Sequence, residues 1–199
     1  MSIQNIFIVS GPSGVGEDSV IDGLTKRLPI ERIITTTTRE PREGEFEGSP
    51  YYFITHKEFE QKIKAGEFIE YAQEYNDNYY GVTQEEIKRV ADTKKIGIWK
   101  IEWKGVITAK KIYPGIVAIF LTVRDLSILE QRIRRRNGSV TEAYIQERME
   151  YTKEWLKHTD IYDYIVYNEE NKLEETIDHV ETILRGKTGI SQKHSQYSK

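Results

Sequence analysis

Residues 6–19 read IFIVSGPSGVGEDS, and this stretch decides the fold. Its first five residues form an almost wholly apolar run, which predicts a buried parallel strand. Gly11 and Gly16 then have the spacing of the phosphate-binding pattern G-x-x-x-x-G-K-[ST]. Apolar residues at helical spacing follow from Val20 to Leu28. A strand, a glycine turn and a helix N-terminus together form an anion site, because free N–H groups and the helix dipole converge there.

The loop departs from the pattern at two places. Glu17 stands where the pattern has a lysine, and Asp18 stands where it has a hydroxyl residue. An ordinary glycine-rich turn between a strand and a helix is the alternative interpretation. The correct glycine spacing in a strand–helix setting favours a phosphate loop over that alternative.

The composition is that of a globular protein of one domain. The chain has 199 residues, 38% of them hydrophobic and 31% charged, with a net charge of −3 and no cysteine. We expect no disulfide, no membrane span and no signal segment, and a cytoplasmic location. The slightly acidic charge argues against a nucleic-acid partner.

The chain order predicts an α/β fold in which helices cover both faces of a parallel sheet. Apolar strand-like runs recur with helical patterns between them; they lie at Ile3–Val9, Ile96–Ile101, Ile116–Val123 and Tyr164–Tyr167. A segment rich in Thr, Gly, Glu and Tyr interrupts this alternation, with a short helix expected over Lys57–Ala65. Arginines followed by Asn-Gly-Ser predict a helix–loop–helix flap that restarts near Thr141.

These patterns divide the chain into one domain with two inserted parts and a tail. We expect a core at 1–34, 83–131 and 152–186, a lobe at 35–82, a lid at 132–151 and a disordered tail at 187–199.

The lobe carries side chains suited to a phosphate and a purine base. Arg39 and Arg42 flank a proline turn and can hold one phosphate in bidentate fashion, which lysine cannot do. Tyr51 and a tyrosine of the stretch Asn78–Gly81 can add hydroxyl groups. A carboxylate in the stretch Glu67–Tyr71 can accept the N1–H and N2–H₂ protons of guanine, a donor pair that adenine lacks. Each residue taken alone is also consistent with an ordinary surface position.

Several motifs in one order along residues 3–184 resemble the guanylate kinase family. They are GPSGVG, TTREPREGE, YYFI, EFIEYA, NYYG and IVYNEE. The resemblance implies a P-loop nucleoside monophosphate kinase fold with a nucleotide-binding lobe and a helical lid. It also implies transfer of the γ-phosphoryl group of ATP to GMP or dGMP, with Mg²⁺ as cofactor, by a monomer or homodimer.

The resemblance assigns roles to individual residues. It implies that the GMP site comprises Thr35, Arg39, Arg42, Tyr51, Glu70, Tyr80 and Glu102. It implies that the ATP site comprises Gly11, Ser13, Gly14, Val15, Gly16, Glu17, Asp18, Ser19 and Asn168. It implies that Arg132, Arg136 and Arg148 are the catalytic lid arginines. We expect Lys100, a departure from the family, to be a further catalytic cation. For Arg134–Arg136 a solvated helix end is the alternative for at least one member.

Lys100 is the third departure, because the family has an acidic residue there. Glu17 close to a phosphate would be repelled by about 4 kcal/mol per unit charge at 4 Å and an effective dielectric near 20. We therefore hypothesise a charge swap, in which Lys100 neutralises Glu17 and reaches the β- and γ-phosphates from the strand side. Asp18 either binds Mg²⁺ directly or serves only as a first-turn acid favoured by the helix dipole.

Two other functions stay open at this point. An aspartate at position 18 also resembles ribose 1,5-bisphosphate phosphokinases, which generally lack the two-arginine, two-tyrosine cage. Guanylate-kinase-like modules of membrane scaffolds bind proteins without catalysis and often have degraded P-loops.

Overall fold

The computed structural model describes residues 3–73, 77–136 and 140–190. A five-stranded sheet forms the core, and all its neighbouring strands are parallel. In spatial order the strands are β2 (Ile30–Arg32), β7 (Ile96–Trp99), β1 (Ile6–Ser10), β8 (Val117–Thr122) and β9 (Tyr164–Tyr167). The four predicted strand regions are therefore confirmed. The edge strand β2 escaped prediction because it has only three residues, two of them charged.

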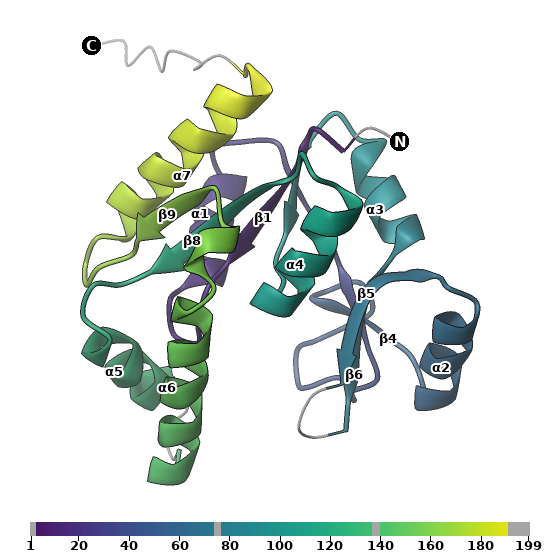
Figure 1. The fold of residues 1–199 in the computed structure, drawn as a ribbon, viewed down its shortest axis with the longest axis horizontal. Helices are drawn as coiled ribbons and strands as arrows, with labels where there is room; N and C mark the ends of the chain where they lie inside the picture. Colours follow the sequence, from purple (N-terminus) through teal and green to yellow (C-terminus); the bar gives the residue numbers. More distant parts are fainter. Residues whose placement is uncertain (1–2, 74–76, 137–139, 191–199) are drawn as a thin grey trace.

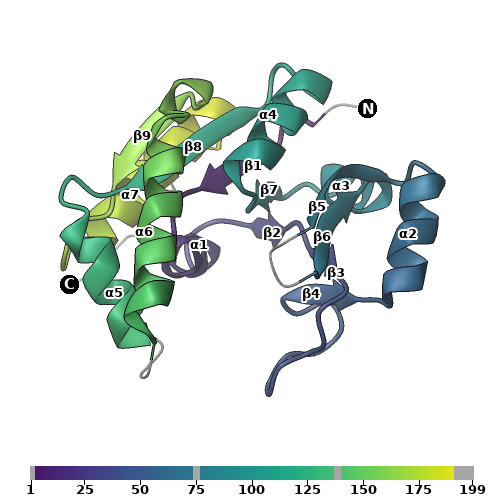
Figure 2. The same ribbon diagram turned by 60° about the horizontal axis from the view of Figure 1, so that its bottom comes forward.

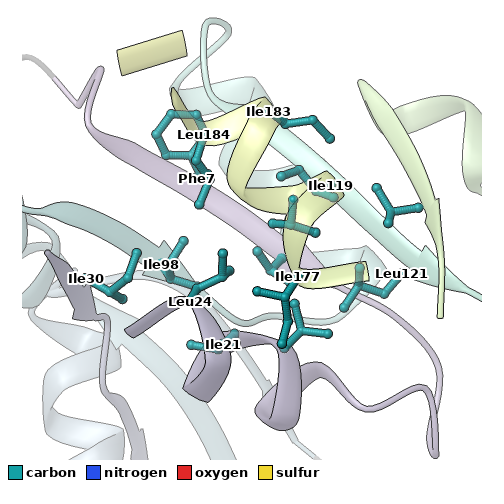
Figure 3. Packing of buried hydrophobic residues seen from close by; sticks show 14 of the residues in the cluster. Phe7, Ile21, Leu24, Ile30, Ile98, Ile119, Leu121, Ile177, Ile183 and Leu184 are labelled. Carbon is teal, nitrogen blue, oxygen red and sulfur yellow. The ribbon is translucent and has the colours of Figure 1, made fainter. Parts of the chain in front are cut away.

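Side chains that alternate along β1 face two different hydrophobic clusters. Phe7 and Val9 pack with helices α1 (Glu17–Thr25) and α7 (Leu173–Thr188), as Figure 3 shows for Phe7. Ile6 and Ile8 belong to the cluster on the other face. That face is covered by α3 (Gln84–Ala91), α4 (Trp103–Ile112) and the end of α6 (Glu142–Leu156), which precedes the short 3₁₀ helix η1 (Thr159–Ile161). Both faces are buried, which is why the strands are nearly all apolar.

The inserted lobe is a second, mixed sheet. Its strands lie in the order β4 (Tyr51–Phe53), β3 (Thr35–Thr37), β6 (Tyr79–Thr83) and β5 (Phe68–Gln73). Helix α2 (His56–Lys64) packs its buried Phe59 against Phe68, with ring centroids 4.2 Å apart. This lobe lies to one side of the core, and α5 (Ser127–Arg136) and α6 lie to the other, in both Figure 1 and Figure 2.

Two boundaries differ from those expected. Helix α6 runs from the expected lid into the core, where Trp155 is buried, so lid and core share one helix. Helix α7 continues through Gly186 to Thr188 and ends at Gly189, whose φ of 69° is the left-handed conformation of a helix C-terminus. The rest of the expected tail, 191–199, lies outside the described residues. None of the helices in the described ranges combines the length and apolar character needed to cross a membrane.

Candidate phosphate and nucleotide site

The glycine loop has the backbone geometry that its sequence predicts. Gly14 and Gly16 have φ values of 84° and 91°, a region that side chains disfavour. A Cβ on Gly11 would lie 2.5 Å from the carbonyl oxygen of Leu121, so only glycine lets β1 pass this close to β8. Gly16 has no side chain to cap α1, which leaves the first-turn N–H groups to bind an anion.

The Asn168 side chain holds the glycine loop through a hydrogen bond to its backbone. Its side-chain N–H donates to the carbonyl of Val15 at 2.7 Å, and its oxygen accepts from Thr176 at 3.0 Å. A Cβ on Gly16 would lie 2.8 Å from the Asn168 nitrogen. Val15 itself is fully buried. Both residues were predicted as ATP contacts, and the structure places their side chains in the framework of the loop.

Lys100 lies beside the loop, but its direct partner is Asp18. Its ammonium is 3.0 and 2.9 Å from the two carboxylate oxygens of Asp18. Arg32, at the end of β2, adds a longer contact to Asp18 at 3.4 Å and binds Asp22 at 2.6 Å. We expected Lys100 to pair with Glu17, but in the structure it contacts the carboxylate of Asp18. Arg32 escaped prediction because β2 was not recognised as a neighbour of β7.

Electrostatics still link Lys100 to Glu17. Burial raises the pKa of the Glu17 carboxyl to about 8, with Lys100 opposing the rise and Asp18 adding to it. Burial disfavours the Lys100 ammonium, but the charges of Glu17 and Asp18 outweigh burial, and the pKa of Lys100 is raised. Below about pH 8 the Glu17 carboxyl is therefore mostly neutral, and Lys100 stays charged.

Three members of the predicted phosphate cage, Arg39, Tyr51 and Tyr80, lie together in the lobe. Arg39 lies 5.4 Å from the ring centroid of Tyr51, which packs edge-on against Tyr80 at 5.9 Å. The Arg39 guanidinium also binds both carboxylate oxygens of Glu45, at 2.8 and 3.0 Å. Arg42 is exposed, and its backbone N–H donates to Glu45 at 2.8 Å.

Two features of this cage matter for catalysis. Burial raises the pKa of Tyr51 and the nearby Lys100 charge opposes the rise, so the ammonium acts on both sides of the site. Glu45 escaped prediction, although an acid three residues after Arg42 is a visible signal. One guanidinium nitrogen of Arg39 makes both contacts to Glu45, and the other donates to the Glu40 carbonyl at 2.7 Å.

Two of the predicted base-reading residues, Glu70 and Glu102, lie close enough at the junction of lobe and core to interact electrostatically. Glu70 lines a recess of about 230 Å³ with Tyr71, Lys104 and Thr108. Burial, and then the charge of Glu102, raise the pKa of Glu70 to about 7. Thr35 lies on β3 of the same sheet, separated from the Glu70 strand β5 by β6.

Glu102 is hydrogen-bonded to helix α6, which begins in the predicted lid. It precedes α4 as its N-cap, and the Tyr151 hydroxyl of α6 donates to its carboxylate. Tyr151 escaped prediction because its role depends on how α6 packs on the core. The contact joins a predicted guanine-contacting residue to the helix that carries Arg148.

The predicted lid arginines have different surroundings. Arg132 reaches the loop, with contacts of 3.4 Å to the Val15 carbonyl and 3.2 Å to the Glu169 carbonyl. Arg148 lies over the ring of Tyr144 at 5.1 Å. Arg134 binds Glu130 and Glu142 and so joins α5 to α6. Arg136 ends α5, and its side chain lies outside the described residues.

A recess of about 190 Å³ opens beside the loop. Its lining comprises Gly16, Ser19, Arg132, Asn168, Glu169, Asn171 and Leu173. Ser13 and Ser19 are exposed at the loop surface. The recess lies where the donor nucleotide was predicted and has the size of part of a ligand, not the whole of one.

Asp18 offers the donor chemistry that a hard cation requires. Its side chain is 48% exposed at the first turn of α1, with both oxygens at the mouth of the loop. Among the described residues no group of three or more His, Asp or Glu side chains could hold a metal ion. The Lys100 ammonium already contacts both Asp18 oxygens, so a cation of the Mg²⁺ type would share this one carboxylate with Lys100 and complete its shell with phosphates and water.

Comparison with known proteins gives one consistent result. A family model described as guanylate kinase matches residues 3–187. The guanylate kinase of Rickettsia felis is 40% identical over 174 residues, covering 85% of this chain and 90% of that protein. The guanylate kinase of Carboxydothermus hydrogenoformans is 37% identical over 180 residues, covering 90% and 86%. A crystal structure of guanylate kinase from Anaplasma phagocytophilum has a TM-score of 0.71 at 29% identity, covering 96% and 87%.

Proposed function

The chain belongs to the guanylate kinase family, and on that premise we propose how its residues transfer the γ-phosphoryl group of ATP to GMP. In this reaction an oxygen of the GMP phosphate attacks the γ-phosphorus, and ADP leaves. The acceptor oxygen is already anionic, so the protein has little covalent chemistry to perform. Its work is to position the two nucleotides and to neutralise phosphate charge.

The observation that carries the proposal is the place of the Lys100 ammonium. It lies within 3.0 Å of Asp18 at the donor loop and acts electrostatically on Tyr51 of the acceptor cage. A cation between the two phosphate sites stabilises charge on the transferring group most effectively. We assign to Lys100 the role that a lysine at position 17 has in the phosphate-loop pattern.

The remaining predicted residues divide into three groups. Arg39, Arg42, Tyr51 and Tyr80 would hold the GMP phosphate, and Thr35, Glu70 and Glu102 would contact guanine. Arg132, Arg148 and Arg136 would approach the ATP phosphates when lid and lobe close and exclude water. The N–H groups of the loop would bind the β-phosphate.

We propose that the divalent cation is Mg²⁺ and that Asp18 is the protein residue that would hold it. When bound, the cation would withdraw negative charge from the phosphates of ATP. Asp18 then plays the part that a hydroxyl residue has in the pattern. Glu17, neutral below about pH 8, leaves the loop free of the repulsion that an ionised carboxylate would cause.

Replacement of Lys100 tests the proposal directly. We expect Lys100→Met to lower kcat by about 10²–10³-fold, the usual effect of removing one group that stabilises transition-state charge. Adding Glu17→Lys to that variant should restore at least part of the loss, because it returns a lysine to the loop. Steady-state ADP formation measures both effects.

Two further arms make the test specific. Lys110→Met removes a lysine that pairs with Asp163, away from the loop, and should leave kcat unchanged. Rescue that fails although the double variant folds would contradict the role of Lys100. Assays with dGMP, AMP, UMP and ribose 1,5-bisphosphate as acceptors define the substrate, and GMP binding without any turnover would favour a non-catalytic binding module.

A further inference from the structure

The junction between lobe and core contains a buried carboxylate that has no place in the site described above. Glu86 lies in the first turn of α3 and is 4% exposed. It sits just after the point where the chain leaves lobe strand β6, which ends at Thr83. A buried carboxylate is costly unless several donors surround it, so its partners show what it holds in place.

The partners of Glu86 come from three segments. One carboxylate oxygen accepts the backbone N–H of Ile34 at 2.8 Å, and the other accepts the Tyr52 hydroxyl at 3.3 Å. Two nitrogens of Arg89 bind the two oxygens, each at 2.8 Å. Glu86 therefore connects α3 of the core both to the chain entering the lobe and to lobe strand β4.

The two lobe contacts fall next to predicted GMP ligands. Ile34 immediately precedes Thr35, and Tyr52 immediately follows Tyr51. Thr35 and Tyr51 are themselves paired across strands β3 and β4. One carboxylate thus fixes the backbone beside a predicted base contact and the side chain beside a predicted phosphate contact.

A second helix of the same chain shows that this geometry is not simply a helix cap. In α2 the third-position Glu58 returns to its N-cap Thr55 and completes a reciprocal capping box. In α3 the N-cap Thr83 accepts from the Glu86 N–H, but the Glu86 carboxylate extends to Ile34 and Tyr52 instead. Its side chain is therefore engaged in joining segments of the molecule.

We propose that Glu86, held by Arg89, is a positioning residue for the acceptor nucleotide. It sets the distance between the base-contacting and phosphate-contacting strands of the lobe and the core that carries the donor loop. The proposal rests on the proposed GMP site. A small displacement of strands β3 and β4 would move their contacts away from GMP. Loosening this connection should therefore weaken GMP binding and leave ATP binding intact.

Tyr52→Phe is the mildest test, because it removes one hydroxyl and keeps the ring. We expect it to raise KM for GMP by about three- to tenfold, the size of one ordinary hydrogen bond, because the 3.3 Å contact is long. Glu86→Gln should raise KM for GMP further, because it also weakens the Arg89 pair. KM for ATP should stay within about twofold of wild type in both variants.

Two control variants distinguish positioning from general stability. Glu31→Gln weakens another ion pair of the same Arg89, at 2.7 Å, without removing a lobe contact. Glu58→Gln weakens the helix cap of α2. We expect both to lower the melting temperature and to leave KM for GMP unchanged. Calorimetric Kd values for GMP, measured without ATP, should rank the variants in the same order as their KM values for GMP.

The outcomes separate this inference from the proposed function. Wild-type protein that binds no GMP would overturn the GMP site itself. Wild-type GMP binding with an unchanged KM in both Tyr52→Phe and Glu86→Gln would overturn only the role of Glu86. Equal increases in KM for GMP and ATP, or an equal effect of Glu31→Gln on KM for GMP, would also overturn it, because a structural role alone explains them.

Discussion

At the residue scale, Glu17 shows how a buried carboxyl can occupy a phosphate loop. An ionised carboxylate there would repel the nucleotide, but burial raises its pKa to about 8. The neutral form is thus the main one at pH 7, and an approaching phosphate favours it still more. Asp18, next along the chain, is instead paired with Lys100 at 2.9 Å. Two adjacent acids therefore differ in what they present to a nucleotide.

This difference predicts a pH dependence of ATP binding. As the pH rises through about 8, Glu17 loses its proton in the free protein, and ATP binding must then include proton uptake. KM for ATP should therefore increase from pH 7 to 9. Glu17→Gln cannot ionise and should remove most of this increase, while it also serves as a control for ionisation of ATP itself. A parallel increase in wild type and variant would show that Glu17 is not the titrating group.

Glu70 predicts the opposite pH dependence for GMP, the acceptor nucleotide. Its pKa is raised to about 7, by burial first and by Glu102 second. The ionised form is the one that can accept two protons from guanine, so KM for GMP should fall as the pH rises from 6 to 8. Glu70→Gln should bind GMP more weakly and lose this dependence. A variant that kept both the affinity and the pH profile of wild type would exclude Glu70 as the base reader.

At the scale of elements, α5 and α6 separate arginines that look alike in the sequence. Arg134 binds one acid on each helix, Glu130 and Glu142, and so fixes the pair of helices. Arg132 is two residues earlier and faces the Val15 carbonyl of the phosphate loop at 3.4 Å. Residues two apart on a helix point in different directions, so Arg132 and Arg134 contact different partners.

This separation predicts different kinetic effects for the two arginines. Arg132→Ala should lower kcat by about 10³-fold or more, as expected for an arginine that stabilises a transferring phosphoryl group. Arg134→Ala should lower the melting temperature slightly, because exposed ion pairs contribute little, and leave kcat within about threefold of wild type. Stopped-flow or steady-state ADP formation and thermal unfolding measure the two effects. If Arg134→Ala lost as much activity as Arg132→Ala, the assigned roles would be wrong.

At the scale of the whole molecule, the two predicted nucleotide sites belong to different parts of one chain. The acceptor cage lies in the mixed sheet β4-β3-β6-β5, and the donor loop lies at the end of β1 in the parallel sheet. Lys100 follows β7 of the core, and Glu86 joins the core to the lobe. Movement of lobe and lid therefore changes the distance between the two substrates.

Ligand-induced stabilisation tests this organisation. At a concentration 100 times its Kd, GMP should stabilise the protein by about 2.7 kcal/mol, and AMP should stabilise it far less. GMP together with a non-hydrolysable ATP analogue should also reduce the radius of gyration in solution X-ray scattering, because both parts close on the ligands. Stabilisation by GMP with no effect of the analogue would indicate a binding module that has lost its donor site.

The sequence by itself determined the architecture and the chemical type of the site. The apolar run of residues 6–10, the spacing of Gly11 and Gly16, and the order of the lobe motifs each depend on local rules of strand, turn and helix. These rules act within a few residues, so a chain read in order reveals them. The arginine–tyrosine cage is visible for the same reason, since its members lie in or beside short motifs.

Only the tertiary structure decided which charged groups meet. Lys100 and Asp18 are 82 residues apart, and the parallel pairing of β1 with β7 brings them together. Arg32, in the unrecognised strand β2, approaches the same carboxylate. Glu86 and Ile34 are separated by 52 residues and meet where the chain crosses between two sheets. Long, flexible charged side chains have many possible partners in a sequence, and packing of the backbone selects one of them.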